Sequence, residues 1–335
     1  MSPASIRAVA SRLACLPSHG LENSGPTLQT MTEPAAGPRR RADELDPLAI
    51  LATLGVARPS AVTPVSGGWD TTIWRVEHGR AAYALRVFRA DQTAQCQREV
   101  AVMQIAAERG MPVPRVHATT IWQERPALLL SWCPGRPLLH AVRARPWQAW
   151  TLGLAMGRVQ AGLHAAPAPE ALAPLLPAWV ARAGETELAV QTRLQSLARR
   201  PAALPHLDYH PLNVMVADRA VTGVLDWANA ALGDPRADLA RTVTLLRLAP
   251  SPPGTPAVLV LGLRRVVEAG WRTGYQQLAG PRFGDLAAFY AWAGAMMERD
   301  LRPKLGKPGV WLQAGDLARI DRWTMSWKRR AGVAP

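Results

Sequence analysis

The sequence predicts an α+β fold in two units, a small one built on an antiparallel sheet and a larger one made mostly of helices. Short apolar runs separated by turn signals fill residues 61–132, which is the pattern of strands. Beyond residue 133 the chain changes to long segments rich in Ala, Leu and Arg, with apolar residues at helical spacing. The length of 335 residues also exceeds what one hydrophobic core usually serves.

The first 42 residues carry Ser, Pro, Gly, Ala and Arg without sustained apolar periodicity, so we expect residues 1–42 to form a disordered tail. Met31 is an alternative start within it. The basic stretch Ile6–Arg12 has the character of a targeting segment, but no apolar segment of adequate length follows, so targeting is not favoured. We expect the two folded units over residues 43–132 and 133–330.

The first unit begins with a helix over Pro47–Leu54, because Asp46 is a good N-cap, Pro47 suits the first turn and Gly55 is a stop signal. A meander of three strands and then a helix follow, with His78-Gly79 as a turn. Two further strands complete the unit. The predicted elements after the first helix are strands Ala61–Val65, Thr71–Val76 and Ala82–Phe88, helix Gln92–Glu108, and strands Thr119–Trp122 and Ala127–Trp132.

The second unit begins with a helix between Trp147 and His164, where apolar residues recur at spacings of three and four. A short strand pair lies in the middle of the unit. A helix then begins at Asp234-Pro235, which combines an N-cap with a first-turn proline. The other predicted elements are strands Val214–Val216 and Val221–Leu225 and helices Ala257–Ala269 and Phe283–Leu301.

The chain carries a formal charge of +14, but the excess is mainly Arg spread along the whole sequence. Only Arg39–Arg41 and Lys328–Arg330 form short basic runs, and no basic stripe with interleaved aromatic residues is present. We therefore expect no nucleic-acid partner.

Three widely spaced cysteines, Cys15, Cys96 and Cys133, lack the paired spacing of a disulfide framework or a zinc site. They favour a reducing, cytoplasmic location. Apolar runs such as Ala127–Leu130 are far shorter than the roughly 20 residues that a membrane helix needs, so we expect no membrane partner.

The most informative stretch runs from His206 to Asn213 and reads His-Leu-Asp-Tyr-His-Pro-Leu-Asn. A predicted strand pair follows it and brings a second carboxylate, Asp226, back beside the first, Asp208. Asp208 and Asn213 alone also suit ordinary loop caps. The hairpin and Asp226 directly afterwards favour a catalytic site instead.

This set of residues fits the transfer of a phosphoryl group from ATP. Mg²⁺ prefers hard oxygen ligands and takes only one or two carboxylates, which Asp226 and the amide of Asn213 can provide. Asp208 is then free to accept the proton of an acceptor hydroxyl. The sequence therefore predicts Asp208 as the catalytic base and Asn213 and Asp226 as the metal ligands.

At these residues the sequence resembles the aminoglycoside phosphotransferase and choline-kinase-like superfamily of small-molecule kinases. The resemblance runs from about Val62 to Ala240. Its most specific parts are His206–Asn213, Leu225–Trp227 and Gly233–Ala240. It implies a two-lobed protein-kinase-like fold, Mg²⁺, and transfer of the γ-phosphate of ATP, with GTP as an alternative donor, to a hydroxyl group of a small molecule.

The resemblance also implies nucleotide contacts in the first unit. A basic residue at the position of Arg86 contacts the phosphates and pairs with an acidic residue at the position of Glu99. This sequence has Arg where the kinase pattern has Lys, which puts phosphate geometry and nucleotide affinity in question. The small residues Ser66, Gly67 and Gly68 suit a phosphate loop, although a plain hairpin turn explains them nearly as well.

Ser131, Trp132 and Cys133 match the segment that joins the two lobes in the family, whose backbone would bind the nucleobase edge. We expect His206 to be a scaffold residue that bonds to loop backbone, and we leave the role of His210 open. We interpret Asp234 and Asp238 as structural supports, because acidic residues are favoured in a first helical turn.

Two rival functions remain. A protein kinase is disfavoured because Asp226-Trp227-Ala228 replaces Asp-Phe-Gly and a helix begins soon afterwards. A nucleotide-binding pseudokinase or regulatory module without turnover stays open, with Arg86 as the feature that invites it. Residues 241–335 hold far more Arg and Lys than Asp and Glu, which argues mildly against polycationic aminoglycosides and for a neutral or anionic acceptor.

Overall fold

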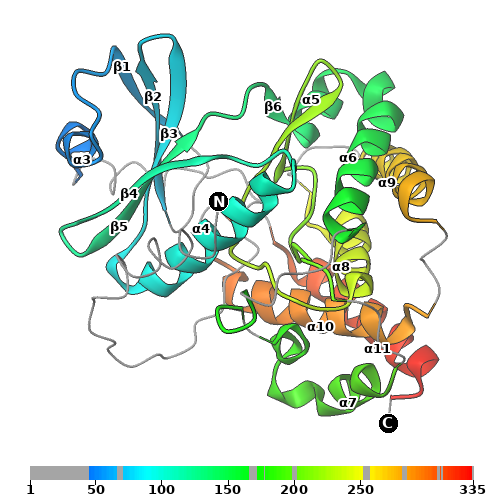
Figure 1. Cartoon of the computed structure of the whole chain (residues 1–335). Coiled ribbons are helices and arrows are strands. Elements are labelled where there is room, and N and C mark those ends of the chain that lie inside the picture. The colour runs from blue at the N-terminus through cyan, green and yellow to red at the C-terminus, as the bar shows by residue number, and fades with distance from the viewer. Residues whose placement is uncertain are drawn as a thin grey trace.

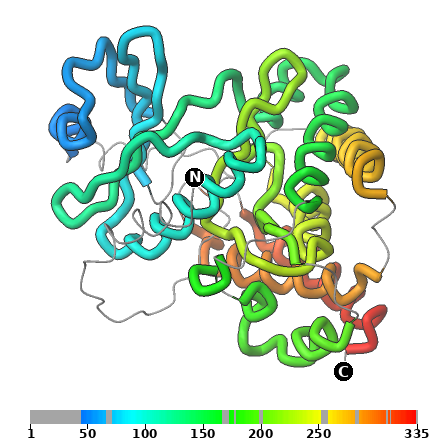
Figure 2. The backbone as a smooth tube through the Cα atoms, viewed as in Figure 1, coloured from blue at the N-terminus to red at the C-terminus, as the bar shows by residue number. Residues whose placement is uncertain are grey.

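The computed structural model describes residues 45–65, 71–165, 172–176, 178–197, 202–251, 257–280, 285–307, 310 and 312–333. The chain forms two lobes (Figure 1), with a β-sheet and helix α4 (Thr93–Glu108) on one side and a larger group of helices on the other. Figure 2 shows the backbone crossing from the sheet to the helices along the segment between β5 and β6. This arrangement confirms the predicted α+β, two-lobed fold.

The sheet of the first lobe has five strands in the order β1-β2-β3-β5-β4, and every neighbouring pair is antiparallel. A short helix, α3 (Pro47–Thr53), packs beside it. The Asp46 carboxylate accepts hydrogen bonds from Leu48 N and Ala49 N at 2.9 and 3.2 Å, so it caps this helix as predicted. The strands are β1 (Ala61–Val65), β2 (Thr72–His78), β3 (Ala81–Val87), β4 (Val116–Trp122) and β5 (Arg125–Ser131).

The second lobe is mainly helical and carries a small sheet in the order β6-β7-β8. Helix α8 begins at Pro235 with Asp234 as its N-cap, as predicted. Short 3-10 turns are η1 (Ala90–Gln92), η2 (Pro146–Gln148), η4 (Trp179–Ala183), η5 (Glu185–Glu187) and η6 (Arg302–Lys304). The strands and α-helices are β6 (Arg136–Pro137), α5 (Leu138–Ala144), α6 (Ala149–Ala165), α7 (Leu188–Ser196), β7 (Val214–Ala217), β8 (Ala220–Val224), α8 (Pro235–Leu248), α9 (Ala257–Ala279), α10 (Ala287–Leu301) and α11 (Ala314–Ala331).

Helices α6 and α9 pack side by side (Figure 1) and approach each other through glycines on both helices. A Cβ added at Gly157 of α6 would lie 2.0 Å from the carbonyl oxygen of Trp271. A Cβ added at Gly274 of α9 would lie 2.1 Å from the carbonyl oxygen of Leu154. Side chains larger than hydrogen at these positions would therefore push the two backbones apart.

The main hydrophobic core extends across both lobes. Val100 and Met103 of α4 and Leu128 of β5 belong to the same cluster of buried residues as Leu152 and Met156 of α6. A separate cluster lies between α3 and the other face of the sheet. The first lobe thus has a core of its own and also shares one with the helices.

The structure differs from the sequence prediction mainly in the second lobe. Helix α9 continues ten residues beyond the predicted end at Ala269. Helices α5, α7 and α11 and the two-residue strand β6 were not predicted. The predicted tail over residues 1–42 lies outside the described residues, as does Phe283, the predicted start of α10. No helix in the described part of the chain combines the length and apolar character needed to cross a bilayer.

Candidate active site

The loop that carries Asp208 has a fixed backbone shape. Leu207, just before it, has a φ of +61°, which is uncommon for a residue with a branched side chain. Its N–H donates to Asp238 Oδ1 at 2.7 Å, and its carbonyl accepts from Arg241 Nε at 3.2 Å. Both partners lie one turn apart on helix α8, so this helix holds the loop in its strained conformation.

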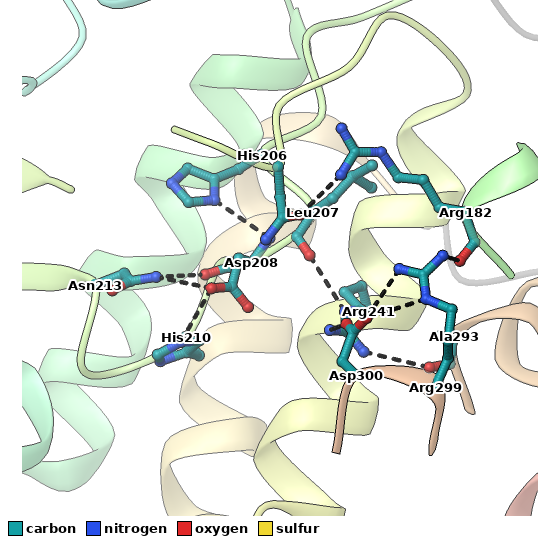
Figure 3. Close-up of polar contacts among 11 residues, drawn as sticks. Arg182, His206, Leu207, Asp208, His210, Asn213, Arg241, Ala293, Arg299 and Asp300 are labelled. Atoms are coloured by element: carbon teal, nitrogen blue, oxygen red, sulfur yellow. Dashed lines mark hydrogen bonds and ion pairs between the residues drawn. The ribbon is translucent and has the colours of Figure 1, made fainter. Parts of the chain in front are cut away.

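The Asp208 side chain is buried, and its two oxygens have different surroundings (Figure 3). Oδ2 accepts a hydrogen bond from Asn213 Nδ2 at 3.2 Å and lies 3.6 Å from His210 Nε2. Asn213 Nδ2 also donates to the Asp208 carbonyl at 3.0 Å. Oδ1 has no hydrogen-bond partner among the described residues. One oxygen of the carboxylate is therefore anchored, and the other is buried without a partner among the described residues.

The surrounding charges keep Asp208 ionised. Burial acts to raise the pKa of this carboxyl, but the electrostatic interactions with His210, Arg241 and His206 and the hydrogen bond to His210 outweigh burial. The pKa of Asp208 therefore lies below its ordinary value. A carboxylate in this state can accept a proton at neutral pH.

His206 joins the loop to the end of strand β8. Its Nδ1 accepts from Asp208 N at 3.2 Å, so the ring proton is on Nε2, which donates to the carbonyl of Leu225 at 2.9 Å. Burial lowers the pKa of His206, against the opposing charges of Asp238 and Asp208. The neutral ring fits both hydrogen bonds, through which His206 connects the loop to the strand.

The β7–β8 hairpin brings Asp226 close to Asn213. Leu225 N donates to the Asn213 carbonyl at 2.8 Å, which extends the pairing of the two strands by one step. Asp226 follows with a φ of +60°. Burial, together with the charges of Glu99 and Asp208, raises the pKa of Asp226 to about 7, although Arg86 acts in the opposite direction. Burial is the largest of these causes, so the charged form of Asp226 is disfavoured mainly because its carboxylate has lost contact with water.

Arg86 and Glu99 come from the first lobe, on β3 and α4. Arg86 Nη1 and Nη2 lie 2.6 and 3.3 Å from the two Glu99 oxygens, and the guanidinium carbon lies 4.5 Å from the Phe88 ring centroid. Glu99 also accepts from Gln95 Nε2 at 3.0 Å. The structure thus brings Arg86 and Glu99 together, and their charges affect the pKa of Asp226, which belongs to the other lobe.

The predicted hinge residues lie where β5 leaves the sheet. Ser131 N donates to the Arg115 carbonyl at 2.9 Å, and Trp132 N donates to the Ala82 carbonyl at 3.1 Å. The Cys133 side chain is buried against Gly223 of β8, where an added Cβ would lie 2.4 Å from Cys133 Sγ. Burial raises the pKa of this thiol to about 11, so it is not a reactive thiolate. The predicted phosphate loop, Ser66–Gly68, lies outside the described residues.

The two aspartates predicted as supports have different contacts. Asp238 is fully buried, and besides Leu207 N it binds His164 Nε2 and Gln160 Nε2, both at 2.9 Å. Asp234 caps helix α8 and pairs with Arg236 on the same helix at 2.6 Å. Asp238 thus acts directly on the loop, whereas Asp234 acts on the helix that carries Asp238.

Sequence reasoning missed Arg241 and its partners. This buried guanidinium binds Leu207 O, the Ala293 carbonyl at 3.3 Å and Asp300 Oδ2 at 3.2 Å (Figure 3). Arg299 also pairs with Asp300, at 2.8 Å. The position of Arg241 three residues after Asp238, and so on the same helix face, was the only signal in the sequence.

A cavity of about 360 Å³ opens beside the loop. His210, Pro211 and Leu212 form one wall. Residues of α5, the C-terminal end of α8 and the N-terminal half of α9 form the others. His210 therefore contacts both the cavity and, at 3.6 Å, the Asp208 carboxylate.

Comparison with known proteins gives one match in sequence. The family described as the phosphotransferase enzyme family matches residues 61–281, more than half of the chain. This match extends about 40 residues beyond Ala240, where the sequence resemblance was expected to end. No curated protein matches the sequence significantly.

Several solved structures are similar in fold. One is the amicoumacin kinase hAmiN in complex with AMP-PNP, Ca²⁺ and Ami, with a TM-score of 0.61 and 13% identity, covering 89% of this chain and 97% of that one. Another is a thermostable mutant of aminoglycoside phosphotransferase APH(4)-Ia in a ternary complex with AMP-PNP and hygromycin B (TM-score 0.58, 16% identity, 86% of this chain and 98% of that one covered). A third is macrolide 2'-phosphotransferase MphH from Brachybacterium faecium (TM-score 0.52, 18% identity, 85% and 95% coverage).

Proposed function

This chain belongs to the phosphotransferase enzyme family, and from that membership we propose that it transfers the γ-phosphoryl group of ATP to a hydroxyl group of a small molecule. The observation that carries this proposal is the Asp208 carboxylate. Its Oδ2 is anchored by Asn213 while its buried Oδ1 lacks a partner among the described residues. A buried acceptor atom without a partner is costly, and a substrate hydroxyl would satisfy it.

We assign the metal ligands to Asn213 and Asp226. The Asn213 amide nitrogen donates its hydrogen bonds to Asp208, so the Asn213 amide oxygen remains for a cation. The raised pKa of Asp226 indicates a carboxylate that a cation would stabilise in its charged form. Amide and carboxylate oxygens suit Mg²⁺, which completes its coordination with water and substrate phosphates. When bound, Mg²⁺ would neutralise the charge that develops on the phosphates.

The nucleotide contacts come from both the first lobe and the hinge. Arg86, held by Glu99, is the proposed phosphate contact, and Ser66, Gly67 and Gly68 are the proposed phosphate loop. The backbone of Ser131–Cys133 is the proposed contact for the nucleobase, with GTP as the alternative donor. In the proposed division, residues 43–132 supply the phosphate contacts and residues 133–330 supply the catalytic loop and the acceptor site.

The proposed reaction is a direct in-line displacement. The acceptor hydroxyl oxygen forms a bond to the γ-phosphorus, and the bond from that phosphorus to the β,γ-bridging oxygen breaks. The hydroxyl proton passes to Asp208 Oδ1, and ADP leaves with the bridging oxygen. Such a general base contributes roughly 10²- to 10⁴-fold in rate.

The test is ADP release from Mg-ATP, with and without a panel of hydroxyl compounds, for the wild-type protein and Asp208→Asn. We expect acceptor-dependent release that falls roughly 10²- to 10⁴-fold in the variant, with nucleotide affinity unchanged. Asp218→Asn, in the exposed turn of the same hairpin, is the matched control and should keep full activity.

Two outcomes would contradict the proposal. Equal transfer by wild-type protein and Asp208→Asn would exclude Asp208 as the base. Binding of Mg-ATP without release to any acceptor or to water would favour the regulatory module without turnover.

A further inference from the structure

We propose that the cavity beside the catalytic loop is the acceptor site and that it selects compact, apolar alcohols without positive charge. This inference rests on the proposed function and names the substrate class of the same site. It is carried by the position of the cavity, the chemistry of its walls and the charge of its polar residues.

The cavity lies beside the loop that carries the base, with His210 as the residue that links the two. His210 lines it, and His210 Nε2 lies 3.6 Å from Asp208 Oδ2. Pro211 and Leu212, the next two residues of the loop, line it as well. Asp208 itself does not line the cavity, so an acceptor bound there would have to extend its hydroxyl group past the His210 ring to reach the buried Oδ1.

The walls of the cavity are apolar. Leu138 and Val142 come from α5, Leu245 and Leu246 from α8, and Leu263 from α9. The first four are buried. Such walls give a bound hydrocarbon its affinity through removal of apolar surface from water, and they offer few partners to a molecule covered in hydroxyl groups.

The polar residues of the cavity carry no negative charge. They are His140, Arg143, His210 and Arg264, and no Asp or Glu occurs among the described residues of its lining. Burial and the nearby charge of Arg319 lower the pKa of Arg264 to about 10, so its guanidinium is still charged at neutral pH. A cationic acceptor would lose water here without gaining a carboxylate partner, which is unfavourable.

The size of the cavity limits the acceptor. Its volume of about 360 Å³ is near the lower end of the roughly 300–1,000 Å³ of ligand pockets. Leu259, which is 63% exposed, lines it too and adds apolar surface that solvent can reach. The site thus suits a compact apolar body that ends in a hydroxyl group.

The experiment measures kcat/KM for a series of straight-chain primary alcohols and for one polycationic aminoglycoside, by ADP release from Mg-ATP. We expect kcat/KM to rise about fourfold per methylene group until the cavity is filled, and the aminoglycoside to give no release above the water background. A flat series, or a better rate with the aminoglycoside, would overturn the inference.

Leu263→Glu tests the site itself, with Leu261→Glu as the matched control. Both lie on α9, but Leu263 lines the cavity whereas Leu261 is 45% exposed and does not. We expect at least a tenfold increase in KM for the longer alcohols in Leu263→Glu, an unchanged water background, and wild-type behaviour in Leu261→Glu. If Leu263→Glu does not fold, Leu263→Trp replaces it in the test. This substitution fills part of the cavity without adding charge, so it should shift the preference toward shorter alcohols.

The two proposals fail in different ways. If Asp208→Asn abolishes transfer but the Leu263 variants leave the alcohol preference unchanged, only the acceptor-site inference is wrong. If the wild-type protein binds Mg-ATP but releases no ADP with any acceptor, the proposed function is wrong, whatever the cavity binds.

Discussion

At the scale of single residues, the ion pair between Arg86 and Glu99 connects the first lobe to the proposed metal site, because both charges act on Asp226. Glu99 is fully buried, and Arg86 is 13% exposed. Glu99→Gln would leave the guanidinium without its counter-charge, and loss of one partner of a buried pair typically costs about 3 kcal/mol or more. We expect this loss in chemical denaturation and a weaker affinity for Mg-ATP. Glu108→Gln, at an exposed position of the same helix, should change neither quantity.

His206 gives the stability a defined pH dependence. Its pKa in the folded protein is lowered by burial, whereas the unfolded chain takes up a proton below about pH 6.5. The unfolded state therefore binds more protons in acid, and the free energy of unfolding should fall as the pH drops below that value. One proton corresponds to a slope of about 1.4 kcal/mol per pH unit.

The measurement compares the pH slope of the unfolding free energy in His206→Gln with that of wild type. We expect the slope to be flatter in the variant, by at most the value of about 1.4 kcal/mol per pH unit that one proton contributes. His78→Gln, at an exposed position of β2, should keep the wild-type slope. An unchanged slope in His206→Gln would show that another group carries the dependence.

At the residue scale, the sequence was informative where contacts are local. Asp208, Asn213 and Asp226 were expected close together because a single hairpin separates them, and the strand pairing places them so. Arg241 reaches Leu207 across 34 positions and Asp300 across 59. No periodicity or motif in the sequence indicates contacts between residues that far apart. The hydrogen bond from Arg241 to the Leu207 carbonyl could therefore be found only in the structure.

At the scale of elements, the crossing of α6 and α9 depends on glycines. Gly157→Ala would place a methyl group 2.0 Å from the Trp271 carbonyl oxygen, so the helices must separate, at a cost of about 1–3 kcal/mol. Gly262→Ala, on α9 with no atom within 4 Å of the added Cβ, should stabilise the protein by roughly 0.5–1 kcal/mol. Chemical denaturation of both variants checks this. Equal effects of the two substitutions would contradict the close approach.

The elements predicted correctly carry strong end signals or regular patterns. Helices α3 and α8 have an Asp-Pro start, and strand β2 alternates, with buried Trp74 and Val76 on either side of exposed Arg75. Helix α5 has only seven residues and no side-chain cap, so little in the sequence marks it. Helix α11 was missed although its buried Leu317, Ile320 and Thr324 recur at spacings of three and four. That signal was present in the sequence.

At the scale of the whole molecule, the two-lobed division followed from the change of pattern near residue 133. The continuous core did not, because it joins α4 and β5 to helices such as α6 through contacts between segments distant in sequence. The acceptor cavity also depends on contacts between segments that are distant in sequence. Its walls come from α5, the loop, α8 and α9.

The hydrogen bond from Arg241 to the Leu207 carbonyl also predicts an order of events during refolding. The β7–β8 hairpin forms from neighbours in sequence, but Arg241 is seated only when α10 supplies Ala293 O and Asp300, 52 and 59 positions away. Contacts of such separation form slowly. In a stopped-flow refolding experiment, secondary structure should therefore recover first and phosphoryl transfer only after α10 has docked. A newly made chain would look folded before it is able to work.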